Sequence, residues 1–152
     1  MFKDNDIITL STSDGYFLAW NITRDVHQTV LLRQDPAQAS WKVRRIIDRY
    51  DDLFKGYQFQ CCAPERSSEY LNGVPSHSEI YLNLADYPGT FWAVVDNTNT
   101  AATGTINLVC LGGEQDGPRF LYGNGASNTL TLVEDSYGEN FEPVKWHYTV
   151  LS

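Results

Sequence analysis

Four short sequence patterns recur three times along the 152 residues, in the same order and at intervals near 50 residues. Three of them are apolar or aromatic runs, at 8–10, 57–59 and 106–108, at 17–20, 70–73 and 120–123, and at 30–32, 80–82 and 130–132. The fourth is a β-type run that opens with a tryptophan, at Trp41, Trp92 and Trp146. Turn-forming Gly, Pro, Asn and Asp residues separate the runs, so each repeat is predicted to hold four short strands.

Repeats of this length constrain the fold, because none can bury its apolar face alone and the three must share one core. Three repeats of four strands predict an all-β fold, the β-trefoil, in which six strands close a barrel and six form hairpins at one end. We expect one domain over residues 1–152, with repeats at about 6–50, 55–98 and 104–152. The recurring leucines should form core layers, at Leu18, Leu71, Leu121, Leu32, Leu82 and Leu132. A sandwich of twelve strands is the competing fold, but it would not explain the threefold spacing.

One segment, residues 44–55, departs from the strand pattern because its apolar residues follow the spacing of a helix face. The repeat register predicts instead that the strand beginning at Trp41 continues to about Ile47. We follow the register, since the elements on both sides support it.

Charge and composition exclude several classes of function. A net charge of −8, from 11 basic and 19 acidic residues, disfavours nucleic acids and anionic membrane surfaces, which both reward basic patches. No run approaches the roughly 18 apolar residues of a membrane span, and the first residues lack an apolar secretory segment. Three cysteines are an odd number, which predicts buried thiols rather than a disulfide framework. We therefore expect a cytoplasmic protein, with unconventional export left open.

Sequence motifs of catalysis are not found. Neither the Gly-x-Ser-x-Gly elbow nor the Walker phosphate loop occurs. His27, His77 and His147 do not have the spacing of metal ligands. The expectation is a binding protein that needs no catalytic residue, metal or cofactor.

An aspartate follows a core leucine by three or four residues in each repeat, at Asp35, Asp86 and Asp135. One interpretation is turn formation, since aspartate accepts hydrogen bonds from its own downstream amides. The other is sugar binding, in which the carboxylate accepts hydrogen bonds from two hydroxyls while an aromatic ring covers the apolar face. Tyr87 and Tyr137 lie beside two of these aspartates.

Trp20 occupies the position that Gly73 and Gly123 occupy in the other repeats. The core does not require an aromatic residue there, so Trp20 is expected at the surface, over its own hairpin or against a ligand. The preferred sugar site lies in the second repeat, at Asn72, Asn83, Asp86 and Tyr87. The other carbohydrate-binding candidates are Trp20, Asp35, Tyr122, Asp135 and Tyr137.

The chain resembles the ricin-B-like β-trefoil lectins, especially the small cytoplasmic ones of fungi. The resemblance rests on the three repeats and on Trp41, Trp92 and Trp146, which stand where that family has a Gln-x-Trp motif. It implies glycan or glycoprotein partners, shallow sites, up to one per repeat, and a homodimer, as many members form. The motif glutamine is replaced in every repeat, so a site here would differ from the usual one of the family.

The layout also looks like that of the fungal β-trefoil protease inhibitors, which present an exposed loop to a protease. Arg24, Arg66 and Arg119 are the candidates for such a loop, and Pro64 and Pro118 would rigidify two of them. A protein-interaction scaffold is a third hypothesis, because the fold alone fixes no function.

Overall fold

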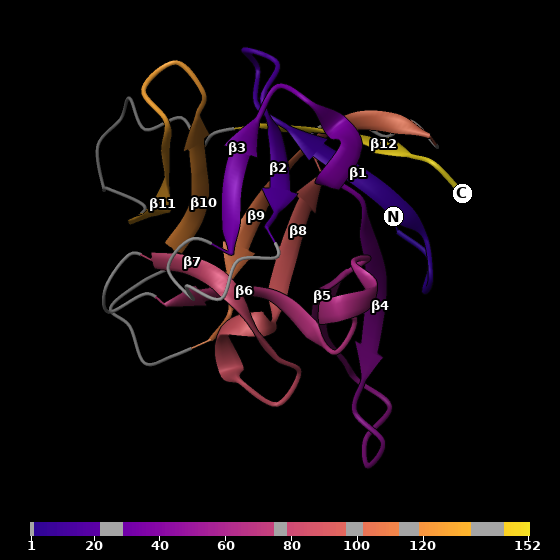
Figure 1. Cartoon of the computed structure of the whole chain (residues 1–152). Helices are drawn as coiled ribbons and strands as arrows, with labels where there is room; N and C mark the ends of the chain where they lie inside the picture. Colours follow the sequence, from indigo (N-terminus) through magenta and orange to yellow (C-terminus); the bar gives the residue numbers. More distant parts are fainter. Residues whose placement is uncertain (1, 22–28, 75–78, 97–101, 113–118, 135–144) are drawn as a thin grey trace.

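The computed structural model describes residues 2–21, 29–74, 79–96, 102–112, 119–134 and 145–152, and the chain in these ranges is built of β-strands and three short 3-10 helices (Figure 1). Six strands form a barrel: β1 (Ile7–Ser11), β4 (Trp41–Ile47), β5 (Phe54–Cys61), β8 (Trp92–Asp96), β9 (Thr103–Cys110) and β12 (Trp146–Val150). Each pairs antiparallel with the next in this order, and β12 pairs with β1, so the ring is closed. Closure leaves no long free edge in the barrel.

The remaining six strands form three hairpins. They are β2 (Phe17–Trp20) with β3 (Val30–Arg33), β6 (Glu69–Val74) with β7 (Glu79–Leu84), and β10 (Arg119–Asn124) with β11 (Thr129–Glu134). In each hairpin the predicted core leucines face each other, as Leu18 and Leu32 do in the first. Strands β3, β7 and β11 also contact one another. A six-stranded barrel with three such hairpins confirms the predicted β-trefoil.

The three recurring tryptophans are fully buried and have the same partner in each repeat. The indole N–H donates to a backbone carbonyl of the preceding hairpin, from Trp41 to Leu18 at 2.9 Å, from Trp92 to Leu71 at 3.0 Å and from Trp146 to Leu121 at 3.0 Å. Because a buried indole needs a hydrogen-bond acceptor, these bonds join each hairpin to the barrel. All six predicted core leucines are buried as well.

The 3-10 helices follow a barrel or hairpin strand and each begins with proline. They are η2 (Pro36–Gln38), η3 (Pro64–Arg66) and η4 (Pro88–Thr90). Helices η2 and η4 occupy equivalent places, after β3 and after β7. Within the described ranges no helix is long and apolar enough to cross a membrane.

The segment with helix-like spacing is a β-hairpin. Strand β4 extends to Ile47, as the register predicted, and pairs with β5 up to Ile47 and Phe54. The turn that joins the two strands projects from the molecule, at the bottom of Figure 1. A register shift between Ile46 and Ile47 marks an irregularity in the ladder. Of the apolar residues with this spacing, Ile46, Ile47 and Phe54 lie in the two strands, and Tyr50 and Leu53 lie in the connection between them, so they do not line a helix.

Candidate functional site

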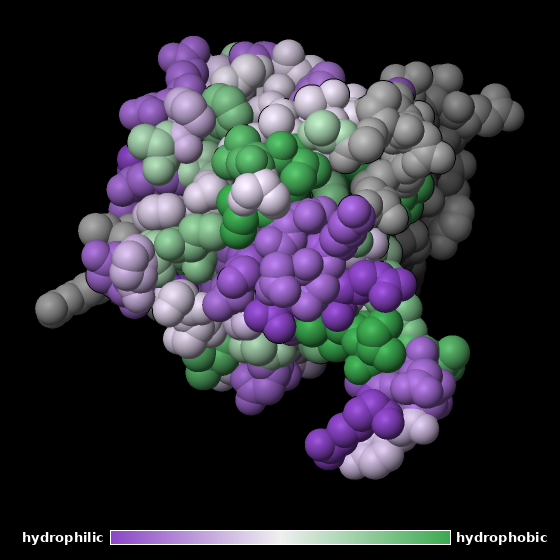
Figure 2. All heavy atoms as spheres, turned by 90° about the vertical axis from the view of Figure 1, so that its right-hand side faces the viewer, coloured by the Kyte–Doolittle hydropathy of each residue, from purple (hydrophilic) through white to green (hydrophobic). Residues whose placement is uncertain are grey.

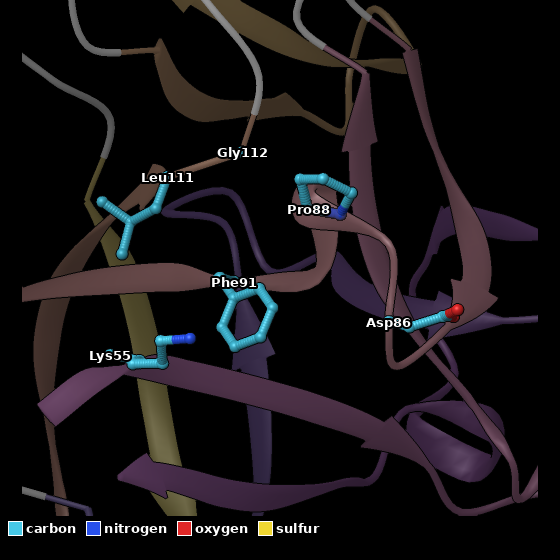
Figure 3. Close-up of a pocket in the computed structure, with 6 residues that line it drawn as sticks. All are labelled: Lys55, Asp86, Pro88, Phe91, Leu111 and Gly112. Atoms are coloured by element: carbon cyan, nitrogen blue, oxygen red, sulfur yellow. The ribbon is translucent and has the colours of Figure 1, made fainter. Parts of the chain in front are cut away.

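A cleft of about 320 Å³ lies in the second repeat, beside the loop between β7 and β8. Its lining comes from three elements: β5, this loop, and the end of β9. The residues are Lys55, Asp86, Pro88, Phe91, Leu111 and Gly112 (Figure 3). A cleft with an aromatic ring, aliphatic walls and a few polar groups has the composition of a small-ligand site.

The loop at residues 85–91 is fixed by a buried polar pair beneath it. The Gln58 side-chain amide donates to the Ala85 carbonyl at 2.8 Å and to the Thr90 hydroxyl at 2.9 Å. The Thr90 hydroxyl in turn donates to the Tyr87 carbonyl at 2.7 Å. Gln58 and Thr90 are both buried. Hydrogen bonds to buried groups hold the loop in one conformation, because breaking them would leave polar atoms unsatisfied.

The opposite wall is held close to this loop by backbone contacts. The Leu111 amide donates to the Phe91 carbonyl at 2.9 Å. A Cβ on Gly112 would lie 2.1 Å from the Pro88 carbonyl oxygen, so only glycine permits this approach. The two walls of the cleft therefore have a fixed separation.

The charged groups of the cleft lie on either side of Phe91. In Figure 3 the Lys55 ammonium points toward the Phe91 ring, whereas the Asp86 side chain points away from it. Lys55 also forms an ion pair of 3.5 Å with Asp48. The hydrogen bond from the Tyr50 amide, together with this lysine, lowers the pKa of the partly buried Asp48 carboxyl. A ligand in the cleft would therefore meet an aromatic face and a cation on a flexible stem.

Two residues of the preferred sugar site lie at this cleft. Asp86 lines it and is exposed, and Tyr87, which is half-exposed, adjoins it in the sequence. Asn83 lies on β7, where its side-chain oxygen accepts a hydrogen bond from the Leu84 amide at 2.9 Å. Asn83 is partly buried and does not line the cleft.

Trp20 and Asn72 are both buried, so the expectation that Trp20 lies at the surface is wrong. Trp20 is only 8% exposed, and its indole N–H donates to the Ser40 carbonyl at 3.0 Å. Asn72 is 3% exposed, and its side-chain oxygen has no partner in the described structure. It lies under the second-repeat loop, since a Cβ on Gly89 would lie 2.7 Å from it. Both side chains fill space between a hairpin and the barrel.

The other candidate residues are dispersed. Asp35 is exposed and caps η2, where its carboxylate accepts a hydrogen bond from the Ala37 amide at 2.9 Å. Tyr122 is partly buried in β10, opposite Thr131. Asp135 and Tyr137 lie outside the described residues. Among the described candidates, Asp35 of the first repeat and Asp86 of the second therefore do not have equivalent surroundings.

Two of the three arginines of the inhibitor hypothesis, Arg66 and Arg119, lie in the described ranges, and neither is a free loop residue. Arg66 pairs with Glu69 at 2.9 Å, with a side chain only 15% exposed. Arg119 is the first residue of β10 and pairs with Cys110 and Glu134 in the sheet, so its expected loop position is wrong. Arg24 and Pro118 lie outside the described ranges, as do His27 and His77.

Sequence reasoning missed Lys55, Phe91 and Leu111. For Phe91 a signal existed: the residue before the repeated tryptophan is Ser40 in the first repeat and Lys145 in the third. An aromatic residue there is not required by the threefold pattern, the same argument that selected Trp20. Nothing in the sequence places Lys55 or Leu111 beside it. No group of three His, Cys, Asp or Glu among the described residues could hold a metal ion.

Solved structures resemble this chain in fold. The apo BEL β-trefoil superposes with a TM-score of 0.68 at 15% identity, over 99% of this chain and 97% of that one. Lysenin in complex with phosphocholine gives a TM-score of 0.67 at 13% identity, over 100% of this chain. The lysenin pore also gives 0.67 at 13% identity. This chain spans less than half of the lysenin chains, 46% and 47%.

The sequence comparisons add nothing to this. No protein-family model matches the chain, and no curated protein matches it in sequence. At 13–15% identity the structural likeness shows the β-trefoil fold alone.

Proposed function

We propose that the protein is a lectin without catalytic activity, and that it binds carbohydrate in the cleft of the second repeat. The observation that carries the proposal is the Phe91 ring, set beside Lys55 in an open cleft whose walls are fixed. An aromatic ring offers an apolar surface for the C–H face of a pyranose, and the neighbouring polar groups orient its hydroxyls. Asp86 and Tyr87, at the rim, would contact further sugar units.

Rigidity supports binding at such a shallow site. The Gln58 and Thr90 hydrogen bonds order the loop before any ligand arrives, so binding does not have to order it. A small contact area still limits affinity, and we expect dissociation constants on the order of 0.1–1 mM for a single sugar site. Higher apparent affinity would then require multivalent presentation.

Phosphocholine belongs in the same test. Lysenin, which shares the fold, has been solved with that molecule. In this chain the Lys55 ammonium suits a phosphate, and the Phe91 ring suits a quaternary ammonium through cation–π attraction. Phosphocholine binding in place of glycan binding would replace the lectin proposal.

A glycan array that also carries phosphocholine, followed by calorimetry with the best ligand, tests the proposal. We expect Phe91→Ala to weaken binding at least about tenfold, because it removes the apolar platform. Leu151→Ser is the matched control, since Leu151 is also exposed but lies outside the cleft lining. No glycan above background, or Phe91→Ala binding like the wild type, would refute the proposed site. Mass spectrometry of the bound glycan after incubation checks that it is not cleaved.

We also propose a reducing, cytoplasmic location. The cysteines of the chain are free, and Cys61 and Cys110 are buried. Free thiols persist where the glutathione pool keeps them reduced. Recovery of the native protein only from a secreted fraction would contradict this part.

A further inference from the structure

The projecting β4–β5 hairpin is the most exposed apolar part of the described structure. Tyr50 is 84% exposed and Leu53 65%, and Ile47 and Phe54 are also exposed. The hairpin extends from the lower edge of the molecule in Figure 2, with apolar surface near its base and hydrophilic surface at its end. Single exposed apolar residues need no explanation, but a contiguous group on a projecting element marks an interaction surface.

One face of the hairpin continues the core face of the barrel. Trp41 and Val43 are buried, and two residues further along the same face come Arg45 and then Ile47. Across the ladder, the Phe54 ring packs edge-on against Tyr57 at 4.9 Å. The Arg45 guanidinium lies over the Phe54 ring, with its carbon 4.8 Å from the ring centroid. No other described segment covers the outer part of this face, at Ile47 and Phe54.

The charges of the hairpin are separated along its length. Residues 42–55 carry five basic and three acidic side chains, whereas the rest of the chain carries six basic and sixteen acidic ones. The base holds Lys42, Arg44, Arg45 and Lys55, and the turn holds Asp48, Asp51 and Asp52, with Arg49 as the exception. Three aspartates at the turn disfavour insertion into a lipid layer. The remaining acidic surface favours a basic partner, and this hairpin is the basic part of the molecule.

We propose that the occupant of this face is a second copy of the same chain, which associates through its own β4–β5 hairpin about a two-fold axis. A two-fold interface uses the same patch on both copies, so the patch must be complementary to itself. This hairpin meets that condition through the charges that its own ion pairs, Lys55 with Asp48 and Arg44 with Asp4, leave unpaired. Arg45 toward the base and Asp52 in the turn lie on opposite sides of the exposed pair Ile47 and Phe54.

An antiparallel arrangement of the two hairpins places the turn of one copy beside the base of the other. Arg45 lies two residues before Ile47, roughly 7 Å along the strand, and the turn residue Asp52 lies two residues before Phe54 on the other strand. Neither Arg45 nor Asp52 forms an ion pair with another described residue. Across the axis, Arg45 of each copy faces Asp52 of its partner, while Ile47 and Phe54 form the apolar centre and Leu53, next to Phe54 in the chain, lies at its rim. Opposite charges around an apolar centre set the register of such an interface.

Charge reversal gives a test that separates this pairing from misfolding. In an Arg45→Glu chain each introduced glutamate would face Asp52, and in an Asp52→Lys chain each introduced lysine would face Arg45. Both homodimers therefore carry two like-charge pairs. In a mixed dimer of the two variants, one pair joins the introduced glutamate to the introduced lysine and the other joins the native Arg45 and Asp52, so both pairs are of opposite charge. Sedimentation velocity from about 1 µM to about 1 mM, the range in which small interfaces associate, measures the mass of each protein and of the equimolar mixture.

We expect the wild type to dimerise, each variant to associate at least about tenfold more weakly, and the mixture to recover wild-type dimerisation. Leu53→Ser should weaken association as well, and Leu151→Ser, an exposed residue outside the hairpin, should not. A wild type that stays monomeric across the range overturns the proposal, as does a mixture no heavier than its components. Flotation of the monomer with phosphatidylcholine vesicles, lost in Tyr50→Ser, would assign the hairpin to a membrane instead. None of these readouts depends on the ligand of the cleft.

Discussion

The loops after β3 and after β7 stand at equivalent positions in the first and second repeats, yet they are stabilised in opposite ways. In the first, Asp35 caps η2 with its own carboxylate, at 2.9 Å from the Ala37 amide. In the second, η4 has no side-chain cap, and the loop is held from below by Gln58 and Thr90. The first loop is thus stabilised locally, and the second depends on the core.

This difference decides what each aspartate can do. The Asp35 carboxylate is used within its own turn, whereas the Asp86 carboxylate has no such role and stands exposed at the rim of a cleft. Because Gln58 and Thr90 hold the second loop from below, the loop keeps its conformation without hydrogen bonds from its exposed side chains. The same sequence pattern therefore yields a turn in one repeat and a candidate binding site in the other.

The largest effect should come from a methyl group placed in the second loop. In Gly89→Ala the new Cβ would lie 2.1 Å from the Gly73 carbonyl oxygen and 2.7 Å from the Asn72 side-chain oxygen. Both neighbours lie in β6, so the strand or the loop must move, at a cost of about 3 kcal/mol in the free energy of unfolding. Urea denaturation monitored by tryptophan fluorescence measures it.

Ala37, which occupies the position of Gly89 in the first loop, provides the matched control. It is exposed, and Ala37→Gly should cost about 0.5 kcal/mol through the entropy of the unfolded chain. Equal losses for the two substitutions would mean that the two loops rest on the barrel in the same way.

Alkaline pH should destabilise the barrel at two equivalent positions, each occupied by a buried cysteine. Cys61 pairs with Trp41 across the barrel strands, and Cys110 pairs with Trp92. Burial raises the pKa of Cys61 to about 11 and also raises the pKa of Cys110. The unfolded thiols lose their protons near pH 8.5. The contribution of the protonated Cys61 thiol to the free energy of unfolding is therefore fully present below that pH. About 2–3 kcal/mol of it is lost as the pH rises toward 11.

Loop exchange distinguishes the two cysteines. The Cys110 sulfur lies 3.8 Å from the Gly89 carbonyl oxygen and 3.9 Å from that of Gly73. A thiolate there repels the second loop, so hydrogen exchange at residues 85–91 should accelerate above pH 9 beyond its ordinary base catalysis. Cys110→Ala should abolish this excess, and Cys61→Ala should not. An excess that persists in Cys110→Ala would place its cause elsewhere.

The fold was predictable because the signal that specifies it is repeated. Leu18, Leu71 and Leu121 recur with the same neighbours, and each equivalent position must satisfy the same packing. The threefold pattern also corrected a local signal, since it placed β4 where the apolar spacing at residues 44–55 indicated a helix. Tertiary context overrides local propensity in this way.

The site was predictable only where it follows the repeat. Asp86 and Tyr87 were found through the aspartate pattern, but Phe91 and Lys55 come together only through the pairing of β5, β8 and β9. Trp20 shows why departures from the pattern are ambiguous. Gly73 and Gly123 leave room for the Trp92 and Trp146 rings, whose atoms lie 3.2 and 2.5 Å from where a Cβ would be. In the first repeat Trp20 is buried instead, a choice that depends on neighbours such as Ser40.

The smallest effect, and the most direct test of the comparison, is the removal of each aspartate in turn. Asp35→Ala loses the cap of η2 and should lower the free energy of unfolding by about 0.5–1 kcal/mol. Asp86→Ala truncates an exposed side chain that does not cap its loop, and its stability should stay within about 0.5 kcal/mol of the wild type, as exposed substitutions do. If the cleft binds glycan, the order reverses for affinity: Asp86→Ala should weaken binding and Asp35→Ala should not. Denaturation of the two variants measures the order of their stabilities, and calorimetry with glycan measures the order of their affinities. A destabilised Asp86→Ala that binds normally would mean that this aspartate, like Asp35, only forms a turn.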